Sequence, residues 1–364
     1  MKFSFLFLML FVILGTNFYV FFRLWHIIPA DKTLFLITAV ALVLCFFLGF
    51  LGGYFLPAGI VTVAYRIGTT WFFIALYLFL IFLALDLLRL VLPMQRILFG
   101  NWFTLGVLTI ALTTVFIYGY FQYWNKSRVE LTVSIGKNIN PLKIVAISDL
   151  HLGYGIGKTE LDEWIRLINR ENPDIVLIAG DIIDNHTKPL VKQNFTSSFQ
   201  KIKSRYGVYA CLGNHEYIGD FDKISGSLDF LRSANITVLR DTAMLINNEF
   251  YLIGRDDRSN PQRKSLAELL YMLDTTKPLF LLDHQPFNLN ETEENGIDLQ
   301  FSGHTHGGQL PPVSWITNLM FEVSHGYLRK GNSHIYVSSG IGIWGGKFRI
   351  GTQSEYVVIE MQNQ

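Results

Sequence analysis

Five short segments decide the fold: KIVAISDLH (Lys143–His151), DIVLIAGDIID (Asp174–Asp184), LGNHE (Leu212–Glu216), LDHQP (Leu282–Pro286) and SGHTHGGQ (Ser302–Gln309). Each contains or directly follows an apolar run typical of a buried strand. The predicted strands are Lys143–Ser148, Asp174–Ala179, Val208–Leu212, Leu279–Leu282 and Leu299–Ser302. Helical periodicity occupies Thr159–Glu171, Leu190–Lys203 and Phe221–Ala234. This alternation of strands and amphipathic helices predicts an α/β fold.

Potential metal-ligating side chains follow these strands directly. In α/β folds, reactive side chains gather just past the carboxyl ends of the strands. Five of the nine histidines lie at such positions, which packing alone would not require. The residues concerned are Asp149, His151, Asp181, Asn214, His215, His284, His304 and His306.

The residue types at these positions suit two divalent cations. Asp149 and His151 are two residues apart, so at the end of an extended strand we expect both to point to one face. The pair His304 and His306 repeats this spacing, and the two carboxylate oxygens of Asp181 can bridge two ions. Mixed carboxylate, imidazole and amide ligands favour Mn²⁺, Fe or Zn²⁺, and the absence of thiolates argues against a structural zinc site. We expect the glycines at 180, 213 and 303 to let the backbone turn beneath the ligands.

The ordered set DLH…GDIID…GNHE…H…GHTH resembles the calcineurin-like metallophosphoesterase family over about Leu142–Ile359. The resemblance implies an αββα two-sheet sandwich whose two metal ions activate a water for attack on a phosphoester. It implies a first metal held by Asp149, His151, Asp181 and His306, and a second held by Asp181, Asn214, His284 and His304. His215 would be catalytic rather than a ligand, stabilising charge on the phosphate or protonating the leaving oxygen.

The glycine-rich tail SSGIGIWGGKFRIG, with LDHQP and GHTHGGQ, resembles the membrane-associated branch of that family. Some relatives in this branch act on lipid-linked phosphates, so the resemblance implies a lipid-linked substrate. The first 124 residues lie outside the family pattern.

The N-terminal third has the composition of a membrane region. Half of the 364 residues are hydrophobic, and only eight of the 59 charged residues lie between Met1 and Trp124. Four apolar stretches there approach or exceed the roughly 20 residues that a membrane-spanning helix needs: Ser4–Phe22, Thr33–Leu56, Thr70–Val91 and Trp102–Tyr123. The first could also be a cleaved signal peptide, although no small-residue cleavage site follows it. We therefore predict a four-helix transmembrane region at 1–124 and a metallophosphoesterase domain at 125–364.

The basic residues favour an integral multi-pass protein with a cytoplasmic catalytic domain. Six basic residues lie on the N-terminal side and four in the opposite loops, and positive charge favours the cytoplasmic side. The two sets are Lys2, Arg66, Lys126, Arg128, Lys137 and Lys143 against Arg23, Lys32, Arg89 and Arg96.

Several residues allow two interpretations. Asp86, inside the third apolar stretch, could mark an ion pathway, although its spacing favours an ion pair with Arg89. Asp184 could support a ligand or cap a helix, and Glu216 could orient His215 or face solvent. Arg349 could bind phosphate or form an exposed ion pair. The apolar run after GGQLPP could pack against the sheet or admit an acyl chain to the metal site; it contains Trp315, Ile316, Leu319, Met320 and Phe321.

The leading functional hypothesis is hydrolysis of a phosphodiester or pyrophosphate bond, in a lipid-linked substrate at the lipid bilayer. The alternative is a membrane-tethered phosphatase for a soluble nucleotide or phosphoprotein. An inert, sensor-like domain is disfavoured because no ligand of the pattern is missing. A net charge of +1 gives no reason to expect nucleic acid as a partner.

Overall fold

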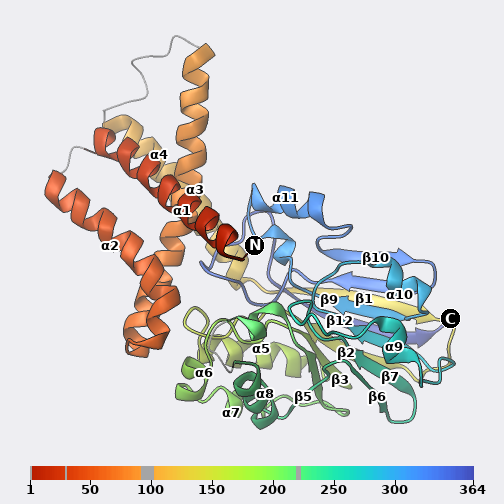
Figure 1. Ribbon diagram of the computed structural model, residues 1–364. Helices are drawn as coiled ribbons and strands as arrows, with labels where there is room; N and C mark the ends of the chain where they lie inside the picture. Colours follow the sequence, from red (N-terminus) through yellow and green to blue (C-terminus); the bar gives the residue numbers. More distant parts are fainter. Residues whose placement is uncertain (1, 29–30, 92–101, 219–222) are drawn as a thin grey trace. The chain divides into compact units, whose positions relative to one another are not determined.

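A computed structural model of the chain describes residues 2–28, 31–91, 102–218 and 223–364 (Figure 1). The chain divides into two compact units, Met1–Tyr118 and Gly119–Gln364. This division falls inside helix α4, and the boundary predicted between residues 124 and 125 stays a prediction.

The first unit consists of long apolar helices. They are α1 (Lys2–Ile27), α2 (Lys32–Leu51), α3 (Ala58–Val91) and α4 (Trp102–Trp124), with a short 3-10 turn η1 (Gly52–Tyr54) after α2. All four are long and apolar enough to cross a membrane. Helix α3 begins at Ala58 rather than Thr70, so Arg66, which the sequence placed in a loop, lies within the helix. Arg96 is outside the described residues.

Asp86 takes part in a polar cluster within the apolar unit. Its carboxylate lies 3.6 Å from Arg89, the predicted partner, but 2.9 Å from Arg23 of α1. The Tyr19 hydroxyl also donates a hydrogen bond to this carboxylate, at 2.5 Å. The structural interpretation of Asp86 is therefore confirmed, with a nearer partner that sequence spacing did not reveal.

The second unit contains two six-stranded sheets. Their strand orders are β1-β12-β2-β3-β4-β5 and β10-β11-β9-β8-β7-β6. Within the first sheet, β2, β3, β4 and β5 form a parallel run, and β7, β8 and β9 form another in the second sheet. The first sheet comprises β1 (Ser127–Ile135), β2 (Leu142–Ile147), β3 (Ile175–Ala179), β4 (Val208–Cys211), β5 (Ile236–Val238) and β12 (Glu355–Asn363). The second comprises β6 (Thr242–Ile246), β7 (Phe250–Gly254), β8 (Leu279–Leu282), β9 (Leu299–Ser302), β10 (Gly326–Lys330) and β11 (Ser333–Val337).

The second unit also contains helices, several of which cover the outer faces of the sheets. The α-helices are α5 (Lys158–Arg170), α6 (Lys188–Lys192), α7 (Thr196–Phe199), α8 (Lys223–Ser233), α9 (Leu266–Leu270), α10 (Asn290–Glu294) and α11 (Val313–Met320). Two further 3-10 turns are η2 (Asn214–Tyr217) and η3 (His306–Gly308). Figure 1 shows α5, α7 and α8 beside the first sheet.

Alternation along the strands explains the layers. Ile144 and Ala146 of β2 join a core cluster with Leu299 and Phe301 of β9, which places that cluster between the sheets. The next residues along β2, Val145 and Ile147, pack instead against the helices of the first sheet. A third cluster joins the outer face of the second sheet to α9. Successive side chains of a strand point to opposite faces, so each sheet buries both faces. The αββα prediction is confirmed.

The five predicted strands correspond to β2, β3, β4, β8 and β9. The single helix predicted at Leu190–Lys203 is wrong: α6 and α7 are separate helices. Between them Asn194 has a φ of 52°, a left-handed conformation that ends a right-handed helix. Within the helix predicted at Phe221–Ala234, the structure describes α8, and residues 221–222 are outside the described part.

The inter-sheet cluster yields a stability prediction. Phe301 is fully buried between the sheets, so Phe301→Ala removes a large side chain and leaves a cavity. We expect the free energy of unfolding to fall by about 3–5 kcal/mol, measured by chemical denaturation of the full-length chain in detergent. The matched control is Tyr271→Ala, at a position that is 84% exposed. This substitution should change the free energy of unfolding by under about 0.5 kcal/mol. Equal losses in the two variants would contradict this layer assignment.

Candidate metal centre

The loops after five strands bring all seven sequence-predicted ligands to one rim of the second unit. The loops after β2, β3 and β4 come from the first sheet, and those after β8 and β9 come from the second. The carboxylate and imidazole residues among the seven fall into overlapping groups whose donor atoms lie within 4.8 Å of one another.

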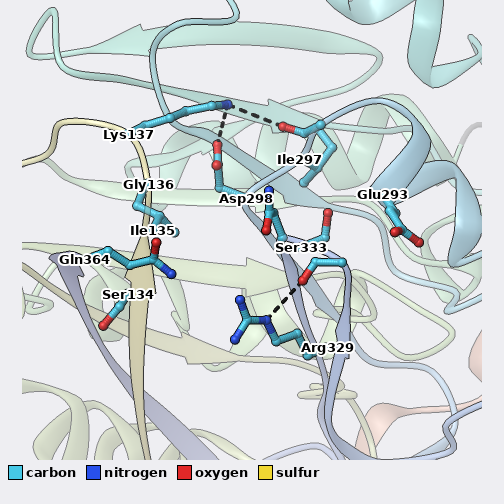
Figure 2. A pocket seen from close by; sticks show the side chains of 13 residues that line it. Ser134, Ile135, Gly136, Lys137, Glu293, Ile297, Asp298, Arg329, Ser333 and Gln364 are labelled. Atoms are coloured by element: carbon cyan, nitrogen blue, oxygen red, sulfur yellow. Dashed lines mark hydrogen bonds and ion pairs between the residues drawn. The ribbon is translucent and has the colours of Figure 1, made fainter.

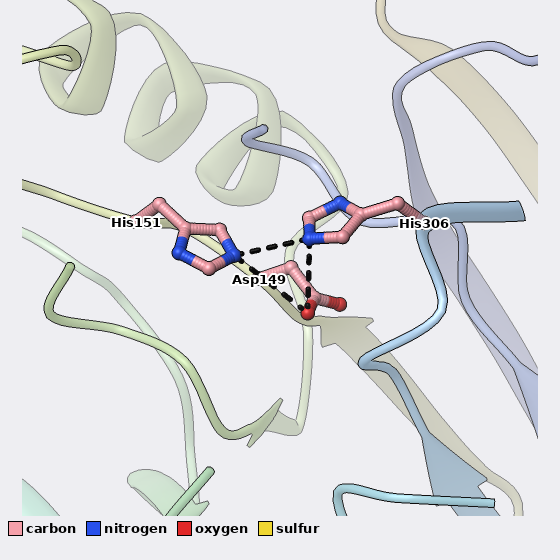
Figure 3. A group of neighbouring side chains, drawn as sticks. All are labelled: Asp149, His151 and His306. Atoms are coloured by element: carbon pink, nitrogen blue, oxygen red, sulfur yellow. Dashed lines mark hydrogen bonds and ion pairs between the residues drawn. The ribbon is translucent and has the colours of Figure 1, made fainter. Parts of the chain in front are cut away.

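The first group contains Asp149, His151 and His306. The Nε2 atoms of the two imidazoles face each other at 3.1 Å, and lie 4.0 Å and 3.7 Å from Asp149 Oδ1 (Figure 3). Two ring nitrogens and one carboxylate oxygen therefore converge on one point. All three residues are buried. This arrangement fits a cation, because two imidazole nitrogens and a carboxylate oxygen can all coordinate one metal ion.

The second group contains Asp181, His284 and His304. His284 Nε2 lies 3.2 Å from Asp181 Oδ2 and makes no hydrogen bond within the described part of the chain. Its other ring nitrogen, Nδ1, lies 2.7 Å from the carbonyl oxygen of Ala179, which fixes the ring. The Asn214 side-chain oxygen lies 2.8 Å from His304 Nδ1, so this amide borders the same group.

Asp181 lies between the two groups. Its Oδ2 atom is 3.7 Å from His151 Nε2 and 3.2 Å from His284 Nε2. Its Oδ1 atom accepts a hydrogen bond from the backbone N–H of His215, at 2.8 Å. This single carboxylate thus has the position that a ligand shared by two cations requires.

The backbone at the ligands is not extended, contrary to the geometry that we expected for Asp149 and His151. Five of the seven predicted ligands have left-handed backbone conformations, with φ between 44° and 72°. They are Asp149, His151, Asp181, His304 and His306. Such conformations are costly for residues other than glycine and concentrate at functional sites. The tight turns at the strand ends, rather than strand alternation, therefore aim these side chains.

The three glycines serve different purposes. Gly180 has a φ of 74°, so it does supply the expected turn. Gly213 and Gly303 are not left-handed; a Cβ atom there would overlap Asp181 and Asp149, respectively. These two glycines instead allow the neighbouring loops to approach the carboxylates closely.

The electrostatic environment keeps two of the imidazoles neutral and favours a positive charge on a third. Burial lowers the pKa of His304 to about 4, and the positive charge of His284 adds to this effect. Burial likewise lowers the pKa of His306 well below its ordinary value. For His284, burial alone would lower the pKa. The negative charge of Asp181 has the opposite and larger effect, so the pKa of His284 is held well above its ordinary value. The site therefore attracts positive charge next to Asp181, while His304 and His306 keep the neutral form that binds metals.

His215, the predicted catalytic residue, forms a further group with His151 and Asp181, whose donor atoms also lie within 4.8 Å of one another. Its Nδ1 atom is 3.2 Å from Asp184 Oδ1, and the same carboxylate is 3.8 Å from His151 Nδ1. Asp184 is buried, and its pKa is held below the ordinary value because the His151 and His215 rings outweigh the effect of burial. Of the two interpretations of Asp184, support of the site is the one that the structure bears out.

Glu216 has a structural role that neither interpretation proposed. It is fully buried, so the solvent-facing interpretation is wrong. Its carboxylate accepts hydrogen bonds from the backbone N–H groups of Asp181 (3.1 Å), Ile183 (2.9 Å) and Gly213 (2.7 Å). It therefore fixes the loops after β3 and β4 to each other. Sequence reasoning missed this role because the partners are backbone groups, which carry no residue signature.

Arg349 also corrects the sequence-based interpretation. It is fully buried, so it neither forms an exposed ion pair nor reaches a phosphate at the surface. Its guanidinium donates to the carbonyl oxygens of His306 (3.0 Å), Ser339 (2.5 Å), Gly340 (3.2 Å) and Gly342 (2.9 Å). Arg349 thus holds the glycine-rich tail against the backbone of a predicted metal ligand.

The apolar run after GGQLPP does not pack against the sheet. It forms α11, on which Trp315, Ile316, Leu319 and Met320 are all exposed. Only Phe321, at the end of the helix, is partly covered, and its ring lies against those of Phe287 and His304.

A separate cavity of about 470 Å³ lies at the ends of β1 and β11 (Figure 2). Its main charged pair is Lys137 with Asp298, at 2.7 Å, and Asp298 also accepts the backbone N–H of Leu279. None of the seven predicted ligands lines it. This cavity therefore has no part in the metal centre.

The fold and the rim of carboxylates and imidazoles define a metal-dependent phosphoesterase class, and comparisons with known proteins agree. A family model described as calcineurin-like phosphoesterase matches residues 142–308. An uncharacterized metallophosphoesterase of Helicobacter pylori is 31% identical over 277 residues, which is 74% of this chain and 73% of the relative. The chain belongs to the calcineurin-like metallophosphoesterase family, whose members use two divalent metal ions.

Two further relatives extend the comparison. An uncharacterized metallophosphoesterase of Campylobacter jejuni is 34% identical over 233 residues, 61% of this chain and 60% of the relative. A transmembrane protein with metallophosphoesterase domain from Danio rerio is 30% identical over 276 residues, 70% of this chain and 62% of the relative. The matches therefore span about three fifths of these two relatives. Together with the four apolar helices, the match to the Danio rerio relative indicates a membrane protein.

The contacts of Asp184 yield a second prediction. Asp184→Asn keeps the shape but removes the charge that faces the rings of His151 and His215. We expect catalytic rate or metal affinity to fall by about 10–100-fold, measured by hydrolysis of bis(p-nitrophenyl) phosphate and by metal titration. Asp229→Asn, at an exposed ion pair, is the control. A variant that matched the unsubstituted chain in both measurements would show that Asp184 does not support the site.

Proposed function

We propose that this chain hydrolyses a phosphodiester or pyrophosphate bond in a lipid-linked substrate. The observation that carries the proposal is the position of Asp181 Oδ2, between His151 Nε2 at 3.7 Å and His284 Nε2 at 3.2 Å. In this proposal the first metal is held by Asp149, His151, Asp181 and His306. The second is held by Asp181, Asn214, His284 and His304.

The donor set suits Mn²⁺, Fe or Zn²⁺, because it mixes carboxylate, imidazole and amide donors. When bound, two such cations lower the pKa of a water and clamp the phosphoryl oxygens for in-line displacement. The protein then needs no covalent nucleophile of its own. Its residues hold the cations, orient the phosphoester and move protons.

His215 supplies the proton transfer in this proposal. Its Nδ1 atom faces the Asp184 carboxylate, and we assign the reaction with the substrate to Nε2. From there it can stabilise charge on the phosphate or donate a proton to the leaving oxygen. Asp184 fixes the ring orientation, as carboxylates do for imidazoles in metal sites.

The lipid-linked part of the proposal is supported by the four apolar helices of the first unit and by the relative named as a transmembrane protein. A domain attached to such helices works at a membrane surface, where amphiphilic substrates are concentrated. We further propose a multi-pass arrangement with the catalytic domain on the cytoplasmic side.

The role of His215 can be tested separately from metal binding. His215→Gln should lower kcat by about 10²–10⁴-fold, while metal analysis of the purified chain still finds two divalent ions. Asp181→Ala is the contrasting variant: it removes the shared ligand, so both activity and metal content should fall. Loss of metal in His215→Gln equal to that in Asp181→Ala would make His215 a ligand and contradict its catalytic assignment.

The substrate class can be tested with the metal-reconstituted full-length chain against phospholipids, UDP-sugar lipids and nucleotides. For a lipid-linked substrate, we expect the rate to fall when detergent micelles are added at constant total substrate, because the surface concentration drops. Asp181→Ala controls for contaminating hydrolases. Activity that is greatest on nucleotides or phosphoproteins and ignores micelle concentration would favour the soluble-substrate alternative.

A further inference from the structure

Helix α11 exposes an apolar face. Its sequence, VSWITNLM, contains no charged residue. Trp315 is 65% exposed and Leu319 is 88% exposed, and Ile316 and Met320 are exposed beside them. At 100° per residue these four positions cover an arc of about 140° on one side of the helix. Its neighbours on the other side include Thr317, which is buried.

One end of α11 reaches the metal centre. Phe321 follows the helix directly, and its ring centroid lies 4.7 Å from that of Phe287 and 6.2 Å from that of His304. His304 is a predicted ligand of the second metal. An apolar surface therefore runs from the exposed helix to the edge of the ligand group.

The other end of α11 is linked to the last apolar helix through consecutive residues. The backbone N–H of Ile350 donates to the carbonyl oxygen of Gln309, which precedes α11, at 3.0 Å. The backbone N–H of Arg349 donates to the carbonyl oxygen of Gly119 in α4, at 2.9 Å. The start of α11 and the end of α4 are thus held side by side.

The end of α4 is fixed firmly to the catalytic domain. Helix α4 ends at Trp124 and strand β1 begins at Ser127, so the connection is very short. Tyr123 is fully buried in the core beside α5, and its hydroxyl donates to Glu160 at 2.6 Å. The end of α4 and the start of α11 therefore lie together within the second unit.

We propose that α11 is an interfacial helix, whose apolar face inserts into the lipid bilayer that α4 crosses. A helix with one apolar face and a tryptophan is suited to the boundary between headgroups and acyl chains. One consequence rests on the proposed function. In that case, α11 and Phe321 let a lipid-linked phosphoester reach the metal centre while the acyl chains of the substrate stay in the bilayer. A second copy of the chain or its own apolar helices are the alternative occupants.

Insertion can be measured with an environment-sensitive NBD label. The full-length chain with Cys45→Ala and Cys211→Ala is reconstituted in phosphatidylcholine–phosphatidylglycerol nanodiscs and labelled at Leu319→Cys. The matched control is labelled at Met272→Cys, a position that is 84% exposed in the turn after α9. We expect lipids carrying a doxyl quencher to reduce fluorescence at 319 to about half or less, and to leave 272 nearly unchanged.

Two results would overturn the proposal. If aqueous iodide quenches 319 as fully as 272, the helix lies in water. If 319 is protected from iodide and also insensitive to doxyl lipids, protein covers it rather than lipid.

An activity measurement separates this inference from the proposed function. Trp315→Ser with Leu319→Ser should lower hydrolysis of a nanodisc-embedded phosphoester about tenfold and leave hydrolysis of bis(p-nitrophenyl) phosphate unchanged. Tyr271→Ser with Met272→Ser is the control pair. Equal losses on both substrates would contradict a role in lipid access.

The two proposals can fail independently. If no lipid phosphoester is hydrolysed at all, the proposed function fails, while quenching at 319 still decides whether α11 inserts.

Discussion

The rest of the metal centre depends on the placement of the Asp181 carboxylate. Asp181 follows β3 in a left-handed conformation, so its backbone must be held against an unfavourable φ. Glu216 provides this restraint by accepting the backbone N–H groups of Asp181, Ile183 and Gly213. A buried carboxylate with three backbone donors is well satisfied, and its hydrogen bonds are strengthened by its charge. The fold thus uses one buried acid to position another.

The site also depends on both sheets, because each sheet supplies part of the ligand set. The loops after β3 and β4 supply Asp181 and Asn214 from the first sheet, whereas His284 and His304 follow β8 and β9 of the second. The inter-sheet cluster that contains Ile144, Leu299 and Phe301 keeps the two rims in register. Packing between the sheets is therefore a condition for the two groups of donors to meet.

The sequence predicted the parts of the fold whose signals are local. Buried parallel strands are continuous apolar runs, and a polar residue after such a run stands out, so β2, β3, β4, β8 and β9 were all recognisable. Strand β12 was not recognisable from the sequence. It pairs with β1 and β2, which lie more than two hundred residues earlier in the chain. Pairing of that kind depends on tertiary context rather than on a local pattern.

Within the site, the residue types were predictable from the sequence, but their environments were not. Glu216 and Arg349 look like surface residues because charged side chains are rarely buried. Both are fully buried here and bind backbone groups, which no motif records. The left-handed conformations of Asp149 and His151 were also hidden, since two-residue spacing suggested an extended strand. Sequence patterns thus identified which atoms meet, while the buried hydrogen bonds decide how they are held.

Arg349 shows why those hydrogen bonds matter for the whole chain. Burial lowers its pKa to about 10, so the guanidinium still carries its charge at neutral pH. Its planar fork can serve several carbonyl oxygens at once, which the single ammonium group of lysine would do less well. One of these carbonyls belongs to His306, and the backbone N–H of Arg349 donates to Gly119 of α4. The same residue therefore joins a predicted metal ligand to the end of an apolar helix.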